Sequence, residues 1–451
     1  MPEPVDQLIH AEWIIPVVPE NQVYTDHTLV INRGRIAAIL PTGQVASQFH
    51  SAQEYTLPGH ALIPGLINAH THGAMALLRG LADDMPLMTW LNEHIWPAEA
   101  KWVSEEFIHD GTQLAVAEML LGGTTCFNDM YFFPDITGRV ASSVGIRAVL
   151  GLIAIDFPSA WANDGDDYLR KGLQVHDHFR TNPIIHTAFA PHAPYSVGNG
   201  ILERIRTLAD ELEIPIHMHV HETHDEIVQG LQHHDNRPLA RLNELGLLSP
   251  ALAAVHMTHL EDNEIELFAA SGGHVVHCPE SNLKLASGFC PVAELLQAGI
   301  NVALGTDGAA SNNDLDMFSE MRSAALLAKG VAKNASALPA AKALSMATIN
   351  GARALGLQQE TGSLESGKSA DLVAVDLHRV NTLPVYHPIS QLVYAAGREQ
   401  VTHVWVAGRP VVSDGRLTTL DDQLLMSRNS DWRERIMAAD TNQVIKYSGY
   451  L

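Results

Sequence analysis

The stretch from Ala61 to His72, ALIPGLINAHTH, decides the fold, because an apolar run leads directly into two histidines one residue apart. Side chains of a strand alternate between its two faces, so His70 and His72 point the same way and can bind one metal ion. Much later in the chain, Asp307 follows a second apolar run, Asn301–Gly305. Apolar runs that end in metal-binding side chains predict strands whose carboxyl ends share one site.

Short apolar runs alternate with longer amphipathic segments from Leu62 to Asp307, which predicts repeated β/α units around a parallel sheet. The expected strands are Ala61–Asn68, Thr124–Asp129, Ile146–Ile155, Ile184–Pro191, Pro215–His221, Leu252–His256, Gly273–His277 and Asn301–Gly305. The expected helices between them include Glu105–Leu121, Leu202–Leu212, Asn263–Ala270 and Val292–Gln297. Eight such units over roughly 250 residues favour an α/β protein with a closed (β/α)8 barrel of the TIM type.

The two ends of the chain predict a small β-sandwich domain beside the barrel. Short strand-like pieces, among them Leu29–Ile31 and Val401–Ala407, alternate there with turn signals. We therefore expect residues 1–60 and 366–420 to form the two parts of the sandwich and residues 61–365 to form the metal-dependent barrel. The last expected segment is a helical C-terminal extension, residues 421–451, with its helix over Gln423–Ala438.

The composition argues against several classes of partner. The 451 residues carry 28 Lys and Arg against 51 Asp and Glu, and this net charge of −23 repels a phosphate backbone or an anionic membrane. We therefore expect neither a nucleic-acid nor a membrane partner. The N-terminus lacks the basic start of a secretory signal, and Cys126, Cys278 and Cys290 are too few and too scattered for a disulfide framework. These features favour the cytoplasm.

Histidines and carboxylates gather at the carboxyl ends of the expected strands, where active sites of barrels of this type lie. They are His70, His72, His192, His217, His219, His221, Glu222, His256, His277 and Asp307. Three of them, His217, His219 and His221, share one face of the fifth strand at a period of two residues. The spacing does not choose among these three.

Three histidines and one carboxylate would leave a coordination position for water, as a catalytic zinc site requires. A metal in such a site lowers the pKa of its water towards about 7 and supplies hydroxide at neutral pH. The hydroxide attacks an electron-poor carbon, and Glu222 is placed to give a proton to the leaving group or ring nitrogen. We expect one divalent ion per chain, with zinc favoured by the histidines, although iron or manganese fit the same ligands.

One motif points to a different chemistry. Residues 362–369, GSLESGKS, match the phosphate-binding pattern GxxxxGK[ST]. Such a loop must run from a strand into a helix, whereas the segment that follows here, Ala370–Asp376, is β-rich. The context therefore argues against a nucleotide triphosphate site.

Four motifs resemble those of the amidohydrolase superfamily. They are Pro64-Gly65-Leu66-Ile67-Asn68-Ala69-His70-Thr71-His72, His219-Val220-His221-Glu222, His277-Cys278-Pro279-Glu280-Ser281-Asn282 and Gly305-Thr306-Asp307-Gly308. Gly367-Lys368-Ser369-Ala370-Asp371-Leu372-Val373 resembles the return of that superfamily to its β-sandwich domain. Within the superfamily, the chain is most similar over nearly its whole length to the 5'-methylthioadenosine/S-adenosylhomocysteine deaminases.

The resemblance implies which residues form the site. The metal would be held by His70, His72, His219 and Asp307, which selects His219 among the three histidines of the fifth strand. Glu222 would carry a proton to the purine ring, His256 would hold and polarise the hydroxide, and Asp307 would also take a proton from the metal-bound water. Substrate contacts would come from Glu99, in Trp96-Pro97-Ala98-Glu99, from His192, in Pro191-His192-Ala193-Pro194-Tyr195, and from Glu222 and Asp307.

The implied reaction is hydrolytic deamination of a small purine nucleoside to its inosine analogue and ammonia. The chain departs from the family in one loop, 156–164, which lacks the arginine that holds the carboxylate of S-adenosylhomocysteine. An unpaired substrate carboxylate would meet acidic neighbours there. We therefore expect 5'-methylthioadenosine to be preferred over S-adenosylhomocysteine, with adenosine also to be tested, and Phe157 or Trp161 to wall the pocket.

Three alternatives follow from the same residues. The first is a guanine deaminase or a triazine hydrolase of the same superfamily, with the same metal and a different pocket. The second is a binuclear relative, but such enzymes need a lysine on the fourth strand, and Ile184–Pro191 has none. The third is a non-catalytic scaffold, which would have lost a metal ligand, and none is missing. Relatives also lead us to expect a homo-oligomer.

Overall fold

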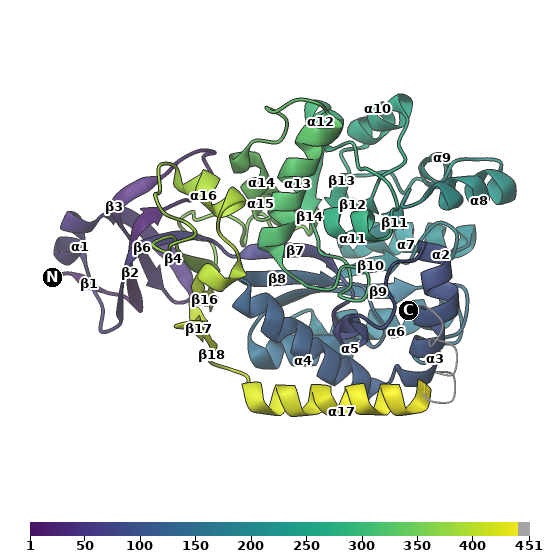
Figure 1. Cartoon of the computed structure of the whole chain (residues 1–451), viewed down its shortest axis with the longest axis horizontal. Coiled ribbons are helices and arrows are strands. Elements are labelled where there is room, and N and C mark those ends of the chain that lie inside the picture. The colour runs from purple at the N-terminus through teal and green to yellow at the C-terminus, as the bar shows by residue number, and fades with distance from the viewer. Residues whose placement is uncertain (441–451) are drawn as a thin grey trace, which may run out of the picture.

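Eight parallel strands form a barrel within residues 1–440, the part of the chain that this computed structural model describes (Figure 1). In barrel order they are β7 (Leu66–Thr71), β8 (Thr124–Asp129), β9 (Arg147–Ala154), β10 (Ile185–Pro191), β11 (Ile216–Val220), β12 (Leu252–His256), β13 (His274–His277) and β14 (Asn301–Leu304). Most of their residues are buried on both faces, because side chains fill the barrel inside and helices cover it outside. The predicted barrel is confirmed.

The predicted bounds of the strands hold from the second strand onward. Thr124–Asp129 and Leu252–His256 have the predicted ends, and the other five differ by a single residue at one or both ends. The first predicted strand, Ala61–Asn68, is wrong as a single strand. Ala61 to Pro64 end β6 (Glu54–Pro64) of the second sheet, and the barrel begins at Leu66.

Gly65 makes this change of sheet possible. Its backbone N–H donates to the carbonyl of Asp371, 2.9 Å away, and a Cβ at this position would lie 1.9 Å from Thr125 Oγ1. Both sides of the glycine are apolar and buried. Hydrophobic pattern alone therefore does not reveal where one sheet ends and the other begins.

The barrel closes between its last and first strands. The backbone N–H of Asp307 donates to the carbonyl of His70, 3.0 Å away. The side chain of Asn68 donates to Thr306 Oγ1 at 2.7 Å and accepts from the Thr306 N–H at 2.9 Å. Gly305 allows this approach, since a Cβ there would lie 2.7 Å from the His70 nitrogen. The closure places Asp307 beside the two histidines of β7.

Helices alternate with the barrel strands and surround them (Figure 1). They are α4 (Glu105–Leu121), α5 (Pro134–Val144), α6 (Gly165–Phe179), α7 (Asn199–Leu212), α8 (His224–His234), α9 (Pro238–Glu244), α10 (Asp262–Ser271), α11 (Pro279–Lys284), α12 (Val292–Gln297), α13 (Met317–Val331), α14 (Ala340–Met346) and α15 (Ile349–Ala354). The four helices predicted by range are present. The side chains of Ser104, Asp164 and Thr223 cap α4, α6 and α8 by accepting a backbone N–H of the first turn.

The two chain ends build a second sheet, at the left of Figure 1. Its order is β18 (Arg416–Leu417), β17 (Arg409–Ser413), β16 (Val401–Val406), β15 (Leu372–Asp376), β6, β2 (Gln7–Ile14), β3 (Tyr24–Asn32) and β4 (Arg35–Pro41). A short pair, β1 (Glu3–Pro4) and β5 (Phe49–His50), and helix α1 (Thr42–Gln48) lie at its edge. Strand β15 pairs antiparallel with β6, which joins the C-terminal to the N-terminal part as predicted.

A buried ion pair joins the barrel to this sheet. Arg147, the first residue of β9, donates to the carboxylate of Asp371 with Nε 2.9 Å from Oδ2, and both side chains are inaccessible to solvent. The carboxylate also accepts from Ser369 Oγ and from the backbone N–H of Ala407 at 2.7 Å each. Because every group has a partner, the pair fixes the position of the sheet against the barrel.

The GSLESGKS segment is a connection rather than a phosphate loop. Lys368 donates to Ser363 Oγ at 2.6 Å and pairs with Glu365 at 2.9 Å, so its ammonium is neutralised within the loop. The chain then enters β15, not a helix, as the β-rich pattern predicts. After β15 come α16 (Pro388–Tyr394) and the 3-10 turn η3 (Arg398–Gln400).

The chain between β7 and α4 folds into short helical pieces over the end of the barrel. They are the 3-10 helix η1 (Gly73–Leu78), α2 (Leu87–Trp90), the π-helical turn η2 (Leu91–Ile95) and α3 (Trp96–Trp102). We call residues 87–102 the helical wall. It is placed by packing, since its residues Leu87, Trp90 and Ile95 belong to a second hydrophobic core, separate from that of the barrel.

The predicted C-terminal helix is present as α17 (Asp422–Asp440), and the rest of the expected extension lies outside the described residues. Helix α17 lies along α4 at the bottom of Figure 1. Its Trp432 is buried, packs edge-on against Phe107 with ring centroids 5.3 Å apart, and donates from Nε1 to Asp110 Oδ2 at 3.0 Å. Trp432 belongs to the same core as the helical wall.

Two absences follow from the described residues. Within residues 1–440, no helix combines the length and the hydropathy that a membrane span needs. Cys126, Cys278 and Cys290 are buried free thiols, in keeping with the expectation that they form no disulfide framework.

Candidate metal centre and active site

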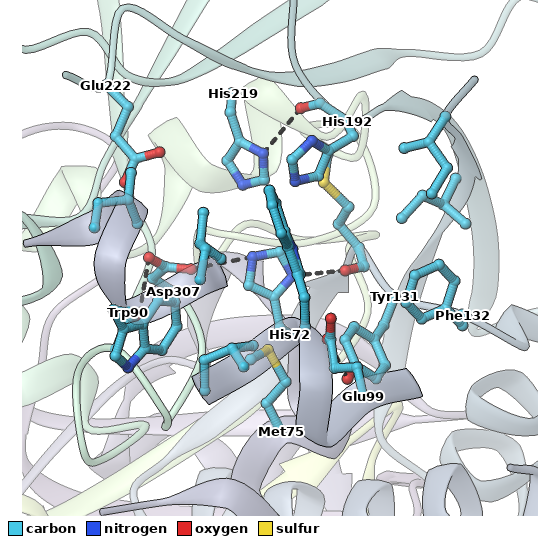
Figure 2. Close-up of a pocket in the computed structure, with 18 of the residues that line it drawn as sticks. His72, Met75, Trp90, Glu99, Tyr131, Phe132, His192, His219, Glu222 and Asp307 are labelled. Carbon is cyan, nitrogen blue, oxygen red and sulfur yellow. Dashed lines mark hydrogen bonds and ion pairs between the residues drawn. The ribbon is translucent and has the colours of Figure 1, made fainter. Parts of the chain in front are cut away.

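The four predicted metal ligands meet at the carboxyl end of the barrel, and Figure 2 shows three of them, His72, His219 and Asp307. His70 Nε2 lies 3.1 Å from His219 Nε2 and 3.3 Å from Asp307 Oδ1, and His72 Nε2 lies 3.2 Å from the same oxygen. Ligand atoms of His70, His72 and His219 all lie within 4.8 Å of one another, and the same holds for His70, His256 and Asp307. The strands therefore bring together side chains that are far apart in sequence.

Hydrogen bonds on the far side of the imidazoles fit these residues to a metal ion. His72 Nδ1 donates to the carbonyl of Met130 at 2.6 Å, and His219 Nδ1 donates to the carbonyl of His192 at 2.9 Å. A carbonyl only accepts, so each of these Nδ1 atoms carries a hydrogen, and Nε2 is the ring atom left to face a metal ion. Burial opposes a charge on His72, but the hydrogen bond and the charge of Asp307 raise its pKa to about 9. Burial holds the pKa of His219 well below its usual value, which keeps the ring neutral.

Asp307 is held from three directions. Its Oδ2 accepts from Ser281 Oγ at 2.6 Å and from Ser311 Oγ at 3.0 Å, and its Oδ1 accepts from the backbone N–H of Gly308 at 2.8 Å. Burial opposes ionisation, but the hydrogen bonds with His70 and His72 hold the pKa of Asp307 well below its usual value. The residue has a φ of +64°, so the backbone is strained to aim an ionised carboxylate at the histidines.

The three histidines at the end of β11 have different surroundings. His219 faces the ligand cluster, whereas His217 lies behind it with Nε2 2.8 Å from His70 Nδ1. His221 faces away, since its Nδ1 donates to the carbonyl of His259 and its Nε2 accepts from the N–H of Leu239. The prediction that all three share a face is wrong for His221, because the strand ends at Val220 and φ turns to +55° at His221.

Glu222 and His256 face each other across the opening of the ligand cluster. Glu222 Oε2 lies 3.8 Å from His256 Nε2, and the His256 ring stacks on that of His219. Asn282 Oδ1, 2.8 Å from His256 Nδ1, orients the ring. Burial raises the pKa of Glu222, which favours a protonated carboxyl that can donate to a ligand.

We call His70, His72, His219, Glu222, His256 and Asp307 the floor of the site. Above it opens a pocket that encloses about 860 Å³ including its mouth. Its sides are mostly apolar and come from the helical wall, from the ends of β8 and β9 and from Leu285. Such a cavity has the size and character of a small-molecule site. His277, at the end of β13, is buried, and burial lowers its pKa to about 3.

Glu99 and His192, the two predicted substrate contacts, both line the pocket. Glu99 comes from α3 of the helical wall, and Tyr131 OH donates to its Oε1 at 2.6 Å. His192 follows β10, and its Nδ1 lies 2.9 Å from Ser196 Oγ. Burial lowers the pKa of His192 to about 3, so the ring is neutral. The structure thus brings every predicted site residue except His70 to the lining of one cavity, and His70 lies in the ligand cluster below it.

In the loop after β9, one of the two residues predicted as pocket walls lines the pocket and the other does not. Phe157 lines the pocket as predicted, but Trp161 does not, since it is buried against Tyr168 in the barrel core. Within the described chain, no arginine lines the pocket. Arg241 lines an adjoining groove, but its guanidinium donates to the carbonyls of Pro194 and Val197 and to Asn199.

Several side chains of the site are absent from the sequence-based prediction. Ser281 and Asn282 hold Asp307 and His256, and they lie in the HCPESN motif, which marks the segment without assigning their contacts. Tyr131 and Ser311 follow β8 and β14 in segments without a recognisable motif. Single polar or aromatic residues in loops carry no periodic signal, so only the folded chain reveals them.

Comparison with known proteins finds similarity over nearly the whole chain. The model of the amidohydrolase family matches residues 61–411. A 5-methylthioadenosine/S-adenosylhomocysteine deaminase of Teredinibacter turnerae is 51% identical over 434 residues, which are 96% of this chain and 98% of that protein.

Solved structures of other proteins share the fold of this chain. An adenosine deaminase from Xanthomonas campestris with bound zinc superposes with a TM-score of 0.96 at 53% identity, over 97% of this chain and 100% of that one. An atrazine chlorohydrolase from Arthrobacter aurescens, complexed with zinc, has a TM-score of 0.88 at 22% identity, over 94% and 99% of the two chains. This last likeness shows the fold alone.

Proposed function

The chain belongs to the amidohydrolase family as a hydrolytic deaminase, and we propose that its substrate is 5'-methylthioadenosine, converted to the inosine analogue and ammonia. The observation that carries the proposal is the convergence of His70, His72, His219 and Asp307 below a pocket in which Glu222 and His256 face the same point. Related proteins with high identity over nearly the full length carry deaminase names, which supports this choice.

We propose that these four side chains hold one divalent ion per chain and that the ion is zinc. The three imidazoles and one carboxylate match the ligands of catalytic zinc, and the zinc in the Xanthomonas structure supports it. When bound, the metal supplies a water whose pKa is lowered towards about 7. The open side of the ligand cluster faces the pocket, as a reacting water requires.

Glu222 is the proposed proton donor to the purine. Addition of water at carbon six places negative charge on ring nitrogen one, and a protonated carboxyl at that nitrogen stabilises the charge. The exocyclic nitrogen then takes up the proton that came from the water, its bond to carbon six breaks and it leaves as ammonia. The hydroxyl on carbon six becomes the carbonyl and returns a proton to Glu222. His256 and Asp307 are the proposed residues that hold the attacking water and accept its proton, and both contribute to the floor.

Glu99 and His192 are the proposed contacts to the ribose. A carboxylate accepts hydrogen bonds from sugar hydroxyls, and a neutral imidazole can donate or accept. Both residues line the pocket, and Figure 2 shows them around His72 and His219. The proposal assigns recognition of the sugar to the helical wall and to the loop after β10.

The proposed preference is for the apolar methylthio group over homocysteine. Phe157 and Leu87 line the pocket, and the exposed carboxylate of Asp156 lines the groove beside it. A homocysteine carboxylate would find no arginine among the residues lining the pocket, and Arg241 already donates to protein oxygens. A charged group left without a partner weakens binding.

The test is a panel of substrates with the purified, zinc-loaded protein. Ammonia release is measured for 5'-methylthioadenosine, adenosine, S-adenosylhomocysteine, guanine and a chlorotriazine, together with metal content. We expect close to one zinc per chain and the largest kcat/KM for 5'-methylthioadenosine, at least about tenfold above S-adenosylhomocysteine. Fastest turnover of guanine or the triazine would overturn the proposal, and a folded protein that binds no metal would favour a scaffold.

Two further parts of the proposal rest on the sequence. We propose that the protein works in the cytoplasm, which its three buried free cysteines support, and relatives lead us to propose a homo-oligomer. Fractionation of the source cells and light scattering of the purified protein test these two parts directly.

A further inference from the structure

We propose that Tyr131 is a positioning residue for the nucleoside, because its hydroxyl holds Glu99 in the orientation that accepts the sugar hydroxyls. The inference rests on the proposed function, in which Glu99 contacts the ribose. It adds a residue that no sequence motif indicates, and it assigns recognition of the sugar to a pair of side chains rather than to one.

The contact itself is short and spans two elements. Tyr131 lies two residues after β8, whereas Glu99 lies on α3 of the helical wall. The tyrosine hydroxyl donates to Glu99 Oε1 at 2.6 Å, and both residues line the pocket beside His72 (Figure 2). Tyr131 is 4% exposed, so its ring is fixed by its surroundings. The fixed hydroxyl of Tyr131 therefore donates to the flexible carboxylate of Glu99.

Glu99 needs such a partner. Helix α3 has seven residues, and each is only partly buried or is exposed, so packing alone does not fix the glutamate. Among the described residues, Tyr131 is the hydrogen-bond donor to its carboxylate. A free glutamate side chain rotates about three bonds and loses this freedom on binding. With Oε1 engaged by the tyrosine, Oε2 is left to accept from the substrate.

The hydroxyl also favours the ionised form of the glutamate. Burial raises the pKa of Glu99, and the hydrogen bond from Tyr131 opposes this rise. An ionised carboxylate accepts from hydroxyl groups and donates nothing, which suits a sugar that presents O–H donors.

Tyr131 is tied to the floor through its neighbours in sequence. The carbonyl of Met130 accepts from His72 Nδ1 at 2.6 Å, and Asp129 Oδ1 accepts from the backbone N–H of Gly73 at 2.7 Å. Three consecutive residues, the last of β8 and the two that follow it, thus hold a proposed metal ligand, the backbone beside it and the proposed sugar contact. The segment fixes the distance between the reacting end of the nucleoside and its sugar.

The decisive experiment removes the hydroxyl from the protein and the sugar hydroxyls from the ligand. The zinc-loaded, full-length Tyr131→Phe variant and the native enzyme are assayed with 5'-methylthioadenosine and with its 2',3'-dideoxy analogue. We expect the variant to lose about tenfold in kcat/KM with 5'-methylthioadenosine, mainly through KM, and less than twofold with the dideoxy analogue. Glu99→Gln should remove the same preference for the ribose, and the double variant should lose no more than Glu99→Gln alone.

The matched control is Tyr168→Phe, which removes a hydroxyl from a buried tyrosine that does not line the pocket. Its kinetics should equal those of the native enzyme with both substrates. Melting temperature and zinc content are measured for every variant. Should Tyr131→Phe fail to fold, 3-fluorotyrosine at position 131 keeps the ring and changes the donor strength, and it should change the ribose-to-dideoxy ratio.

Three outcomes would overturn the inference. They are an equal loss with both substrates, no loss with either, or an unchanged ratio with fluorotyrosine. Failure of the proposed function is distinguishable from these, because the native enzyme would then turn over neither 5'-methylthioadenosine nor its analogue.

Discussion

The floor and the helical wall of the site are built by different means. The floor comes from strand ends, where the backbone of a closed barrel fixes each side chain and hydrogen bonds orient it from behind. The wall, residues 87–102, consists of short helical pieces that depend on packing against Tyr131 and Trp432. Geometry of the floor is thus set by main-chain pairing, and that of the wall by side-chain contacts.

This difference suggests a division of tasks. Groups that take part in bond breaking need fixed positions, which strands of a barrel provide. Groups that select a substrate sit on segments that can vary without disturbing the sheet. We therefore expect changes in the floor to abolish turnover with little effect on the fold, and changes in the wall to alter KM.

The largest effect is expected for Asp307→Asn in the floor. An amide cannot replace the ionised carboxylate beside His70 and His72, so kcat should fall by at least about a thousandfold while the circular dichroism spectrum stays native. Zinc content and ammonia release are the measurements. Asp135→Asn changes a partly exposed carboxylate on α5 that pairs with Arg139, away from the pocket, and should leave both unchanged. Appreciable turnover by Asp307→Asn would show that the reaction does not need the carboxylate of Asp307.

Glu222→Gln should reduce kcat by about a hundredfold to ten-thousandfold, the range for loss of a general acid. Because burial raises the pKa of Glu222, the native enzyme should lose activity as the pH rises through that raised pKa and the carboxyl loses its proton. The variant should lack this alkaline limb in its kcat profile. An identical limb in both proteins would assign it to another group.

Trp432→Ala tests the packing below the wall. Removal of a buried indole costs about 3 kcal/mol of stability, measured by urea denaturation. The cavity lies in the core shared with Trp90 and Ile95, so KM should also rise while zinc content stays at one per chain. Met437→Ala, at an exposed position of the same helix, is the control. If the zinc content falls together with the stability, the geometry of the floor depends on the packing below the wall, and the proposed division of tasks is wrong.

Phe157→Ala should have the smallest effect. The ring is 47% exposed at the edge of the pocket, so its loss removes only part of an apolar contact with the methylthio group. We expect KM for 5'-methylthioadenosine to rise about threefold and kcat to stay the same. Phe289→Ala, another exposed phenylalanine, should change neither. A drop in kcat would mean that Phe157, at the edge of the pocket, also orients the purine ring for the reaction.

The same contrast explains which parts could be predicted. Strand runs that end in His70, His72, His219 and Asp307 form a periodic pattern, so the barrel and its ligand cluster follow from the residues and from family motifs. Trp161 was predicted to wall the pocket and instead lies in the barrel core, because an aromatic residue in a loop can pack to either side. Hydrophobicity alone does not give its direction.

The sequence by itself determined the repeated β/α units, the pairing of both chain ends and the strand ends that carry the chemistry, since these depend on local period and order along the chain. Tertiary structure alone decided where β6 passes into β7 at Gly65, which way His221 turns, and that Tyr131 reaches Glu99. Each of these depends on contacts between residues far apart in the chain, and such contacts leave no mark in a local pattern.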